Sequence, residues 1–422
     1  MSLDTLLSSV TPAIGRILDR ALGGADITVE EGTRLFDADG NGLLIITAAA
    51  DHLRKKSVGD VVTYVVNRNI NFTNVCVKAC GFCAFSRGHL AEEGYYLPLE
   101  EITRRAKEAW DLGATEVCVQ AGLAPGMDGW HYVKLCRALK EALPELHIHG
   151  FSPEEVLYGS TQTGVTVREY LSALKQAGVG SLPGTSAEIL VDEVRDKISP
   201  GRIPTAKWVE LIETAHELGI RTTSTIMYGH IENSHHKAIH LGILREIQMR
   251  TGGFTEFVPL SFVYEEAPMY HRKKISDLRT GATGVEVMKM YAVSRLMLNN
   301  WIPNLQVSWV KEGPKLSQIS LMAGANDFGG TLINESISTA AGAGYGQLMK
   351  PSQFRNMIRE MGRIPAERST TYKKIKVFET EGNPVDLLDE VEDPKAKFGS
   401  YQQLIRQQDN RFKDFYRARK NS

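Results

Sequence analysis

Short runs of β-branched and aromatic residues alternate with amphipathic helical segments along most of the chain. The runs favour strands, because such side chains fit a pleated, half-buried surface. The segments between them carry apolar residues at helical spacing, and most of them end at a glycine. The predicted strands lie within residues 61–74, 115–122, 146–153, 178–186, 220–229, 255–263, 304–310 and 327–333. This alternation predicts an α/β fold with a parallel sheet covered by helices, most simply a closed (β/α)8 barrel of the TIM type.

Two segments flank the predicted barrel. Residues 1–58 have helical periodicity interrupted at Gly23-Gly24 and Asp39-Gly40, so we expect an N-terminal helical segment. Residues 59–370 then contain the barrel. Residues 371–422 pass from an acidic to a basic stretch. We interpret them as a charged, partly helical tail that is solvated rather than bound to a partner.

Charge and composition exclude several classes of function. The chain of 422 residues has 49 basic and 50 acidic side chains, and such a balance gives no strong attraction for nucleic acid or anionic lipid. A hydrophobic fraction of 42% is typical of a globular protein. No apolar run approaches the ~20 residues of a membrane span, and the N-terminus lacks a signal-peptide pattern. We therefore expect a cytoplasmic protein that binds neither nucleic acid nor membranes.

The strongest chemical signal is a cluster of cysteines directly after the first predicted strand. Cys76, Cys80 and Cys83 have the spacing C-x3-C-x2-C, which in a reducing compartment indicates metal binding rather than disulfides. Three thiolates on one loop can bind three irons of a 4Fe-4S cluster and leave the fourth iron open. Zinc is the weaker alternative, because a structural zinc site normally has four ligands. Cys118 and Cys136 lie in a predicted strand and a predicted helix, and we interpret them as core residues.

This motif resembles that of the radical S-adenosylmethionine (SAM) superfamily, including the aromatic Phe82 before the third cysteine. Longer strings between residues 45 and 375 more narrowly resemble the tyrosine-using subunits of 7,8-didemethyl-8-hydroxy-5-deazariboflavin (FO) synthase. The strings are NRNINFTNVCVKACGFCAFSRG, GATEVCVQAGL, HIHGFSPEEV, SLPGTSAEIL, STIMYGHIE, FTEFVPLSF and GANDFGGTLINESIS.

The resemblance implies an activity and its cofactors, a 4Fe-4S cluster and SAM. A 5′-deoxyadenosyl radical takes hydrogen from the amino group of L-tyrosine, and the Cα–Cβ bond breaks. The 4-hydroxybenzyl fragment adds to C5 of 5-amino-6-(D-ribitylamino)uracil, while 2-iminoacetate, L-methionine and 5′-deoxyadenosine are released. A second radical SAM subunit then cyclises the product, so we expect this cyclase as a partner. A closed barrel mouth suits such chemistry, because it keeps a carbon radical away from water.

The resemblance also implies cofactor-binding roles for residues near the predicted strand ends. Gln120 and Gly122 would lie against the methionyl group of SAM, and Glu188 would bind its ribose. Arg202 would pair with the methionyl carboxylate as a two-pronged donor. Each residue also has a structural alternative. Gln120 and Gly122 would form only a strand-ending turn, Glu188 would cap a surface helix, and Arg202 would only hold a loop in place.

Other polar residues at the same predicted face are candidates for the substrates. His230 and Glu232 follow the fifth predicted strand, where two ionisable groups suit a proton relay or a contact with the substrate amine. We expect them to be catalytic, although a lone histidine is usually structural. The candidate substrate-binding residues are Tyr228, Glu256, Ser261, Asn326, Asp327 and Thr331.

Two other functions compete with this interpretation. One is an aminofutalosine-synthase-like enzyme of menaquinone biosynthesis, which shares much of the same frame. The other is a non-catalytic iron-sulfur module that serves a partner protein. An open iron and many polar groups at the predicted strand ends favour an enzyme over a passive module.

Overall fold

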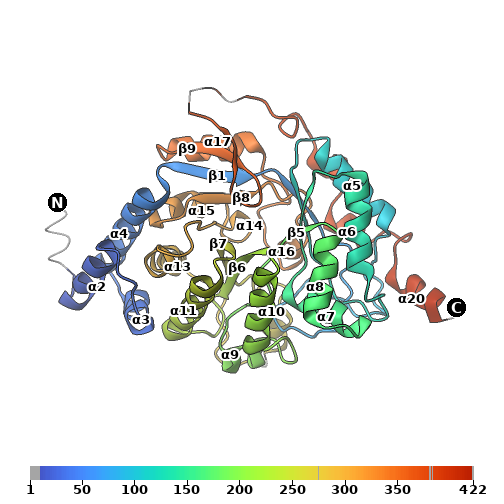
Figure 1. The fold of residues 1–422 in the computed structure, drawn as a ribbon, viewed down its shortest axis with the longest axis horizontal. Coiled ribbons are helices and arrows are strands. Elements are labelled where there is room, and N and C mark those ends of the chain that lie inside the picture. Colours follow the sequence, from blue (N-terminus) through green and yellow to red (C-terminus); the bar gives the residue numbers. More distant parts are fainter. Residues whose placement is uncertain (1–9, 274, 380–381, 383, 421–422) are drawn as a thin grey trace.

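Parallel strands form the centre of the computed structural model, which describes residues 10–273, 275–379, 382 and 384–420 (Figure 1). Residues 1–9 of the predicted N-terminal segment lie outside these ranges. The strands are β1 (Val61–Val65), β2 (Asn67–Ile70), β3 (Glu116–Val119), β4 (His147–Gly150), β5 (Val179–Leu182), β6 (Arg221–Tyr228), β7 (Phe254–Ser261), β8 (Asp327–Gly330), β9 (Ile364–Arg368) and β10 (Lys374–Val377).

The strands close into a ring. Strands β2 to β7 are neighbours in chain order, and β1, which leads directly into β2, pairs in parallel with β8. Single parallel bridges from Leu305 to Phe257 and from Gln306 to Asp327 connect β7 with β8. The predicted α/β barrel is thereby confirmed. Strand β9 adds to the other edge of β1, and β10 pairs antiparallel with β9.

Two predicted strands differ from the observed ones. The first run is divided into β1 and β2, and the chain then continues into the loop that carries the cysteines. The run at 304–310 forms only the two bridges and then enters helix α14 (Trp309–Glu312). The backbone N–H of Leu305 donates to the side chain of Asn326 at 2.8 Å. A side chain thus takes the place of a ladder partner and interrupts the strand.

Helices cover the outside of the ring. Around the barrel they are α5 (Leu99–Trp110), α6 (His131–Ala142), α7 (Pro153–Thr163), α8 (Val167–Gln176), α9 (Asp192–Ile198), α10 (Thr205–Glu217), α11 (Ser234–Thr251), α12 (Pro268–Arg272), α13 (Gly284–Leu298), α15 (Pro314–Ser320), the 3-10 turn η1 (Leu321–Ala323), α16 (Ile337–Ala340) and α17 (Pro351–Glu360). Several start at capping boxes, such as Ser152 with Glu155 and Thr166 with Glu169, which satisfy otherwise unpaired N–H groups. Helix α11 ends at Gly252 in the left-handed conformation.

The N-terminal helices pack against one side of the barrel. They are α2 (Pro12–Leu22), α3 (Val29–Asp37) and α4 (Asn41–Val58), seen at the left of Figure 1. Gly32 of α3 lies so close to α13 that an added Cβ would be 2.5 Å from Met297 Sδ. A side chain at this position would therefore require Met297 to move.

The C-terminal tail is helical at α18 (Pro394–Phe398), α19 (Tyr401–Leu404) and α20 (Phe412–Lys420). The expectation of a solvated appendage is wrong for its aromatic residues. Tyr401 lies 5.7 Å from Phe85 between ring centroids, Phe415 stacks on Tyr96 at 4.6 Å, and Phe412 is fully buried. The expectation was based on the charged residues of the tail and overlooked these aromatic residues. Burying them stabilises the packed tail more than solvation of the surrounding charged groups would stabilise a detached one.

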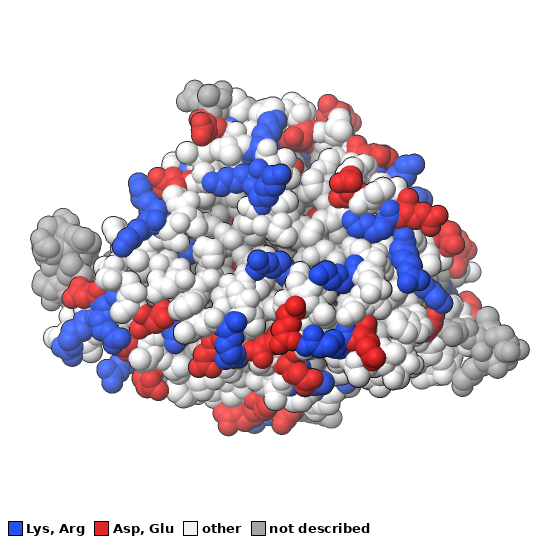
Figure 2. Space-filling model, in the orientation of Figure 1, with Lys and Arg blue, Asp and Glu red and all other residues white. Residues whose placement is uncertain are grey.

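Charges of both signs are interspersed over the face shown in Figure 2, as the near-zero net charge requires. None of the helices in the described part of the chain has the length and apolar character that a bilayer crossing requires.

We expect Phe412→Ala to release the tail from the barrel. Removing a fully buried phenyl group destabilises its packing by about 3 kcal/mol, because the cavity collapses only in part. Hydrogen exchange should then accelerate across residues 401–417 while the barrel strands stay protected. Leu387→Ala is the control, since that side chain is exposed. Unchanged exchange in the Phe412 variant would show that the tail does not depend on this contact.

Candidate active site

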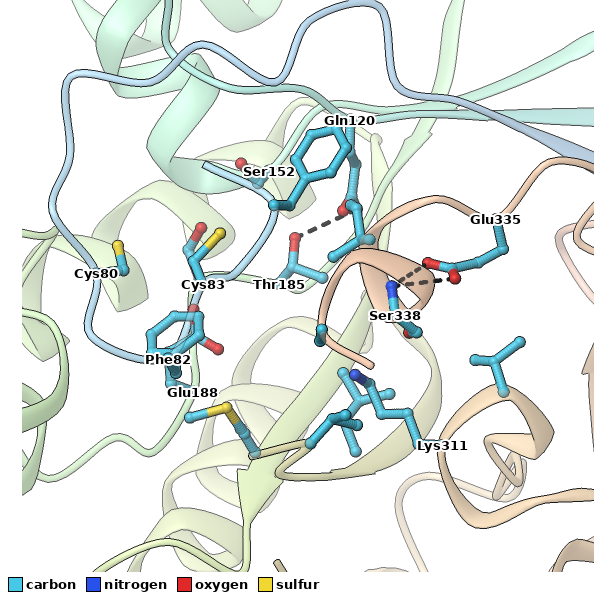
Figure 3. Close-up of a pocket in the computed structure, with 18 of the residues that line it drawn as sticks. Cys80, Phe82, Cys83, Gln120, Ser152, Thr185, Glu188, Lys311, Glu335 and Ser338 are labelled. Atoms are coloured by element: carbon cyan, nitrogen blue, oxygen red, sulfur yellow. Dashed lines mark hydrogen bonds between the residues drawn. The ribbon is translucent and has the colours of Figure 1, made fainter. Parts of the chain in front are cut away.

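A cavity of about 350 Å³ lies at the carboxyl ends of the strands. Its wall is formed by the loop after β2, the end of β3, the start of α7, the loop after β5, the end of β7, and residues from the segments 306–311 and 329–341. In barrels of parallel strands, this is the end at which the loops build the active site. The cavity is therefore the candidate active site (Figure 3).

Cys76, Cys80 and Cys83 all line this cavity. Burial raises the pKa of the Cys80 thiol to about 12, although Arg202 opposes the shift. Burial also raises the pKa of Cys83, and the nearby Cys76 raises it further. The thiols of Cys80 and Cys83 are therefore protonated at neutral pH, although Arg202 lies near Cys80. Binding to metal would deprotonate them.

The loop that carries the cysteines, residues 76–83, is held by distant segments. The N–H of Val77 donates to the carbonyl of Leu123 at 2.9 Å, and the N–H of Gly81 donates to the carbonyl of Ile198 at 2.8 Å. Because the loop has no regular secondary structure, these contacts fix its backbone. They place the thiols against the cavity rather than in solvent.

The donor set fits an iron-sulfur cluster better than a single metal ion. Soft thiolates are the preferred ligands of such clusters, and three thiols border one cavity here. Within the described residues, no three His, Cys, Asp or Glu side chains converge as ligands of one ion. Convergence is not needed in a cubane, where each thiolate binds a different iron.

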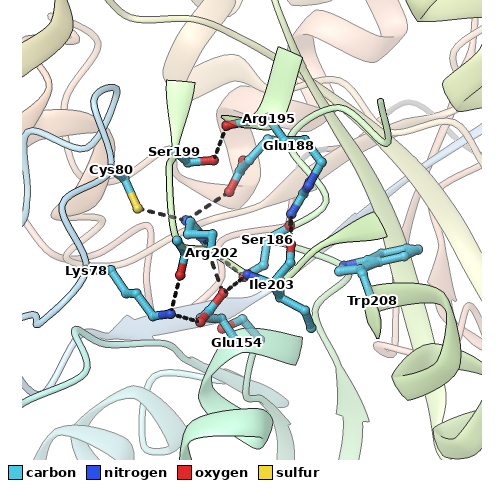
Figure 4. A network of polar contacts seen from close by, with 12 residues as sticks. Lys78, Cys80, Glu154, Ser186, Glu188, Arg195, Ser199, Arg202, Ile203 and Trp208 are labelled. Atoms are coloured by element: carbon cyan, nitrogen blue, oxygen red, sulfur yellow. Dashed lines mark hydrogen bonds and ion pairs between the residues drawn. The ribbon is translucent and has the colours of Figure 1, made fainter. Parts of the chain in front are cut away.

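Arg202 connects the cysteine loop with the loop after β5 (Figure 4). Its guanidinium lies 3.0 Å from Glu188 Oε1, 3.5 Å from Cys80 Sγ and 2.5 Å from Ser186 Oγ. A fourth contact reaches Glu154 at 3.6 Å. Burial opposes its charge, but Glu188 and the Cys80 thiol raise the pKa of Arg202 above its ordinary value. Glu188 and Arg202, both predicted to bind SAM, are thus brought together.

Other buried contacts shape the same region. Lys78 Nζ lies 3.0 Å from Glu154 Oε1, so the second cation of the cysteine loop region is also paired. Arg195 donates to the Ser186 carbonyl at 3.0 Å. Glu188 itself has a positive φ of 43°, which is uncommon outside glycine. Its carboxylate is thereby directed into the cavity lining.

The end of β3 meets the cysteine loop at very close range. Gln120 lines the cavity and its amide contacts Thr185 Oγ1 at 3.3 Å. An added Cβ on Gly122 would lie 2.3 Å from the carbonyl oxygen of Val75, so only glycine fits. Glu155 accepts the N–H of the residue between them at 2.9 Å, and burial raises its pKa to about 7. The predicted pair Gln120 and Gly122 therefore borders the site.

Ser261 is the one predicted substrate-binding residue that lines the cavity. The sequence interpretation missed its neighbours on this side, Lys311, Glu335 and Ser338, which lie away from Cys80 and Cys83 in Figure 3. Lys311 directly follows the predicted run 304–310, and Glu335 follows the last run. Taking the first polar residue beyond each strand would have found Lys311 but not Glu335, because Asn334 precedes it.

Tyr228, His230 and Glu232 do not line the cavity. Met227 faces it, so the next side chain in the strand points away, and the Tyr228 hydroxyl donates to Glu312 at 3.1 Å. His230 Nε2 lies 3.0 Å from the Met227 carbonyl, and Glu232 accepts the backbone N–H of His230 at 2.9 Å. Burial lowers the pKa of His230, with Glu232 opposing. This geometry supports a structural role rather than the predicted catalytic one.

The other four predicted substrate residues are also buried away from the cavity wall. Asp327 is the first residue of β8, and its carboxylate accepts from Arg368 at 2.9 Å. Arg368 also approaches Glu256 at 3.5 Å, and burial raises the pKa of Glu256 to about 7. Asn326 accepts from Arg295 at 2.9 Å, whereas Thr331 donates to a β2 carbonyl at 2.8 Å. These groups stabilise the barrel interior.

The fold and the cysteine site together define a radical SAM protein. The sequence profile of the "Radical SAM superfamily" matches residues 70–241, and that of the "CofH/MqnC C-terminal region" matches residues 251–380. The solved structure of methylornithine synthase superposes with a TM-score of 0.63 at 20% identity, covering 83% of this chain and 97% of that one. That likeness supports the fold.

Curated relatives define the family more narrowly. A 5-amino-6-(D-ribitylamino)uracil–L-tyrosine 4-hydroxyphenyl transferase of Methanothermobacter thermautotrophicus is 49% identical over 361 residues, covering 86% of this chain and 97% of its own. The FO synthase of Streptomyces avermitilis is 46% identical over 83% of this chain but only 40% of its own length. The chain belongs to the family of 5-amino-6-(D-ribitylamino)uracil–L-tyrosine 4-hydroxyphenyl transferases. The resemblance found in the sequence is confirmed.

If Glu232 is structural, Glu232→Gln should lower the free energy of unfolding by about 2 kcal/mol, because hydrogen bonds to a buried charge are lost. Urea denaturation measures the change. Glu286→Gln is a matched control, since Glu286 binds the same Arg279 but is more exposed. This variant should lose under about 1 kcal/mol of its free energy of unfolding. A stable Glu232 variant with product formation reduced about 100-fold would instead support a catalytic pair.

Proposed function

We propose that the chain is the tyrosine-using transferase of deazaflavin (FO) biosynthesis. In this reaction the Cα–Cβ bond of L-tyrosine breaks and the 4-hydroxybenzyl group joins C5 of 5-amino-6-(D-ribitylamino)uracil. The other products are 2-iminoacetate, L-methionine and 5′-deoxyadenosine. The observation that carries the proposal is three thiols of the C-x3-C-x2-C loop bordering one cavity at the barrel mouth, in a chain 49% identical to such a transferase.

Cys76, Cys80 and Cys83 would hold a 4Fe-4S cluster, and the cavity beside them would take SAM. When bound, the cluster supplies the electron that cleaves SAM to L-methionine and a 5′-deoxyadenosyl radical. Gln120 and Gly122 border the space for the methionyl group, while Glu188 and Arg202 offer a carboxylate and a guanidinium to the nucleoside and the methionyl carboxylate. Their mutual ion pair keeps both charges satisfied before the cofactor arrives.

The protein around the cavity keeps water away from the reaction. The barrel interior beneath it is filled by the buried polar groups around Asp327 and Arg368, and Gln306 of the cavity wall accepts from Arg368 at 3.2 Å. A dry, closed floor protects a carbon radical from competing reactions and holds the reactants in near-attack geometry.

A second enzyme is expected to consume the product, because the transfer leaves the deazaflavin ring open. We propose the radical SAM cyclase as a partner of this chain. The Streptomyces FO synthase supports this arrangement, since the region matched here is only 40% of that longer chain.

The test of the function is a product assay with anaerobically reconstituted protein, SAM, reductant, L-tyrosine and the ribitylaminouracil. We expect a product whose mass exceeds that of the uracil by a 4-hydroxybenzyl group less one hydrogen, formed together with 5′-deoxyadenosine. A product only with an enolpyruvyl benzoate would identify an aminofutalosine-type enzyme. Intact cluster without any 5′-deoxyadenosine would identify a passive module.

Replacing any one of Cys76, Cys80 or Cys83 by Ala should abolish cluster absorbance and 5′-deoxyadenosine formation, since two thiolates hold a cubane poorly. Cys118→Ala and Cys136→Ala are matched controls, because neither thiol lines the cavity. Both should retain the cluster. Equal loss of cluster in the Cys118 variant would contradict the proposed ligand set.

A further inference from the structure

Lys311 places a positive charge in the cavity wall without a direct ion-pair partner. Its ammonium makes neither a hydrogen bond nor an ion pair with any residue that the structure describes. The other cations of the wall differ, since Lys78 is paired with Glu154 and Arg202 with Glu188. Burial lowers the pKa of Lys311, while the more distant Glu335 and Glu312 oppose the shift. A half-buried cation that lines a cavity and has no direct ion-pair partner is suited to bind an anionic ligand.

The chemistry of the reactants decides which anion fits. The uracil ring is neutral at physiological pH and brings no charge to match an ammonium. SAM carries a carboxylate, but the proposed site for its methionyl group lies with Arg202 beside Cys80. Lys311 lies on the side of the cavity away from Cys80 and Cys83 (Figure 3). The carboxylate of the amino acid is the remaining negative group.

Glu335 supplies the complementary charge on the same side. Its two oxygens accept the N–H of Ser338 at 2.9 and 3.0 Å, which holds the carboxylate at the start of α16 beside the cavity. Lys311 and Glu335 do not form an ion pair with each other. Each therefore keeps bonding capacity for a ligand that carries both an ammonium and a carboxylate on one carbon.

We infer that Lys311 binds the carboxylate of the tyrosine substrate and that Glu335 receives its amino group. This inference rests on the proposed function and assigns the orientation of the substrate within it. With both α-substituents held at this wall, the amino group has a fixed place in the cavity and the phenol extends away from the pair. Ser261 also lines the cavity and is available for the second substrate.

The test measures binding, so it does not depend on turnover. Reconstituted protein with SAM and without reductant is titrated calorimetrically with L-tyrosine and with tyramine, which lacks the carboxylate. Lys311→Met keeps the length of the side chain and removes its charge, so its affinity for tyrosine should fall about 10- to 100-fold. Its affinity for tyramine should not change. Lys311→Arg should recover most of the tyrosine affinity.

Glu335→Gln tests the second contact in the same way. We expect it to lower the affinity for tyrosine about tenfold. The affinity for 3-(4-hydroxyphenyl)propionate, which lacks the amine, should not change. Lys134→Met is the surface control, because Lys134 lies in an exposed pair with Asp128 outside the cavity. It should bind tyrosine as the unchanged protein does.

Several outcomes would overturn the assignment. One is undiminished tyrosine affinity in Lys311→Met, and another is an equal loss for tyrosine and tyramine, which would reveal a structural role. Loss of affinity for the ribitylaminouracil alone would assign Lys311 to the other substrate. Failure of the proposed function is distinguishable, because the unchanged protein would then form no tyrosine-dependent product.

Discussion

The site depends on fixing an irregular loop inside a closed cavity. The cysteine loop has no helix or strand to satisfy its backbone, so its N–H groups donate to carbonyls of other segments. A steric constraint adds to these hydrogen bonds. Gly122 lies so close to Val75, next to Cys76, that a single added carbon would overlap the backbone. Because the end of β3 bears directly on the loop, the barrel sets the position of the thiols.

Electrostatics divides the cavity into two sides. Around the cysteines every cation in the wall has an acidic partner, so that side is balanced before any ligand binds. The Lys311 and Glu335 side holds separated charges that do not pair. Burial raises the pKa of Glu335 and lowers that of Lys311, which means that both charged forms gain from a ligand of opposite sign. The charges of the first side are thus already paired before a ligand binds, whereas those of the second side favour a ligand that carries both charges.

The fold and one side of the site could be predicted from the sequence, because periodicity and cysteine spacing are local signals. Cys76, Cys80, Cys83, Glu188 and Arg202 all line the cavity as expected.

Several residues expected to contact the substrates lie elsewhere, because a shift of one residue in a strand reverses the direction of a side chain. Tyr228 and Met227 show this directly, since only Met227 faces the cavity. Asp327 was expected to contact the substrate, but it starts β8 instead of ending it. Its side chain therefore lies deep in the barrel.

The two sides of the cavity also belong to different parts of the sequence. Cys80, Glu188 and Arg202 fall within residues 70–241, which match the profile of the whole radical SAM superfamily. Lys311 and Glu335 fall within residues 251–380, which match the narrower C-terminal profile. A structure only 20% identical still shares the barrel, so the fold alone does not select a substrate. The side chains at the later strand ends, where the unpaired charges lie, are therefore the proposed source of substrate selectivity.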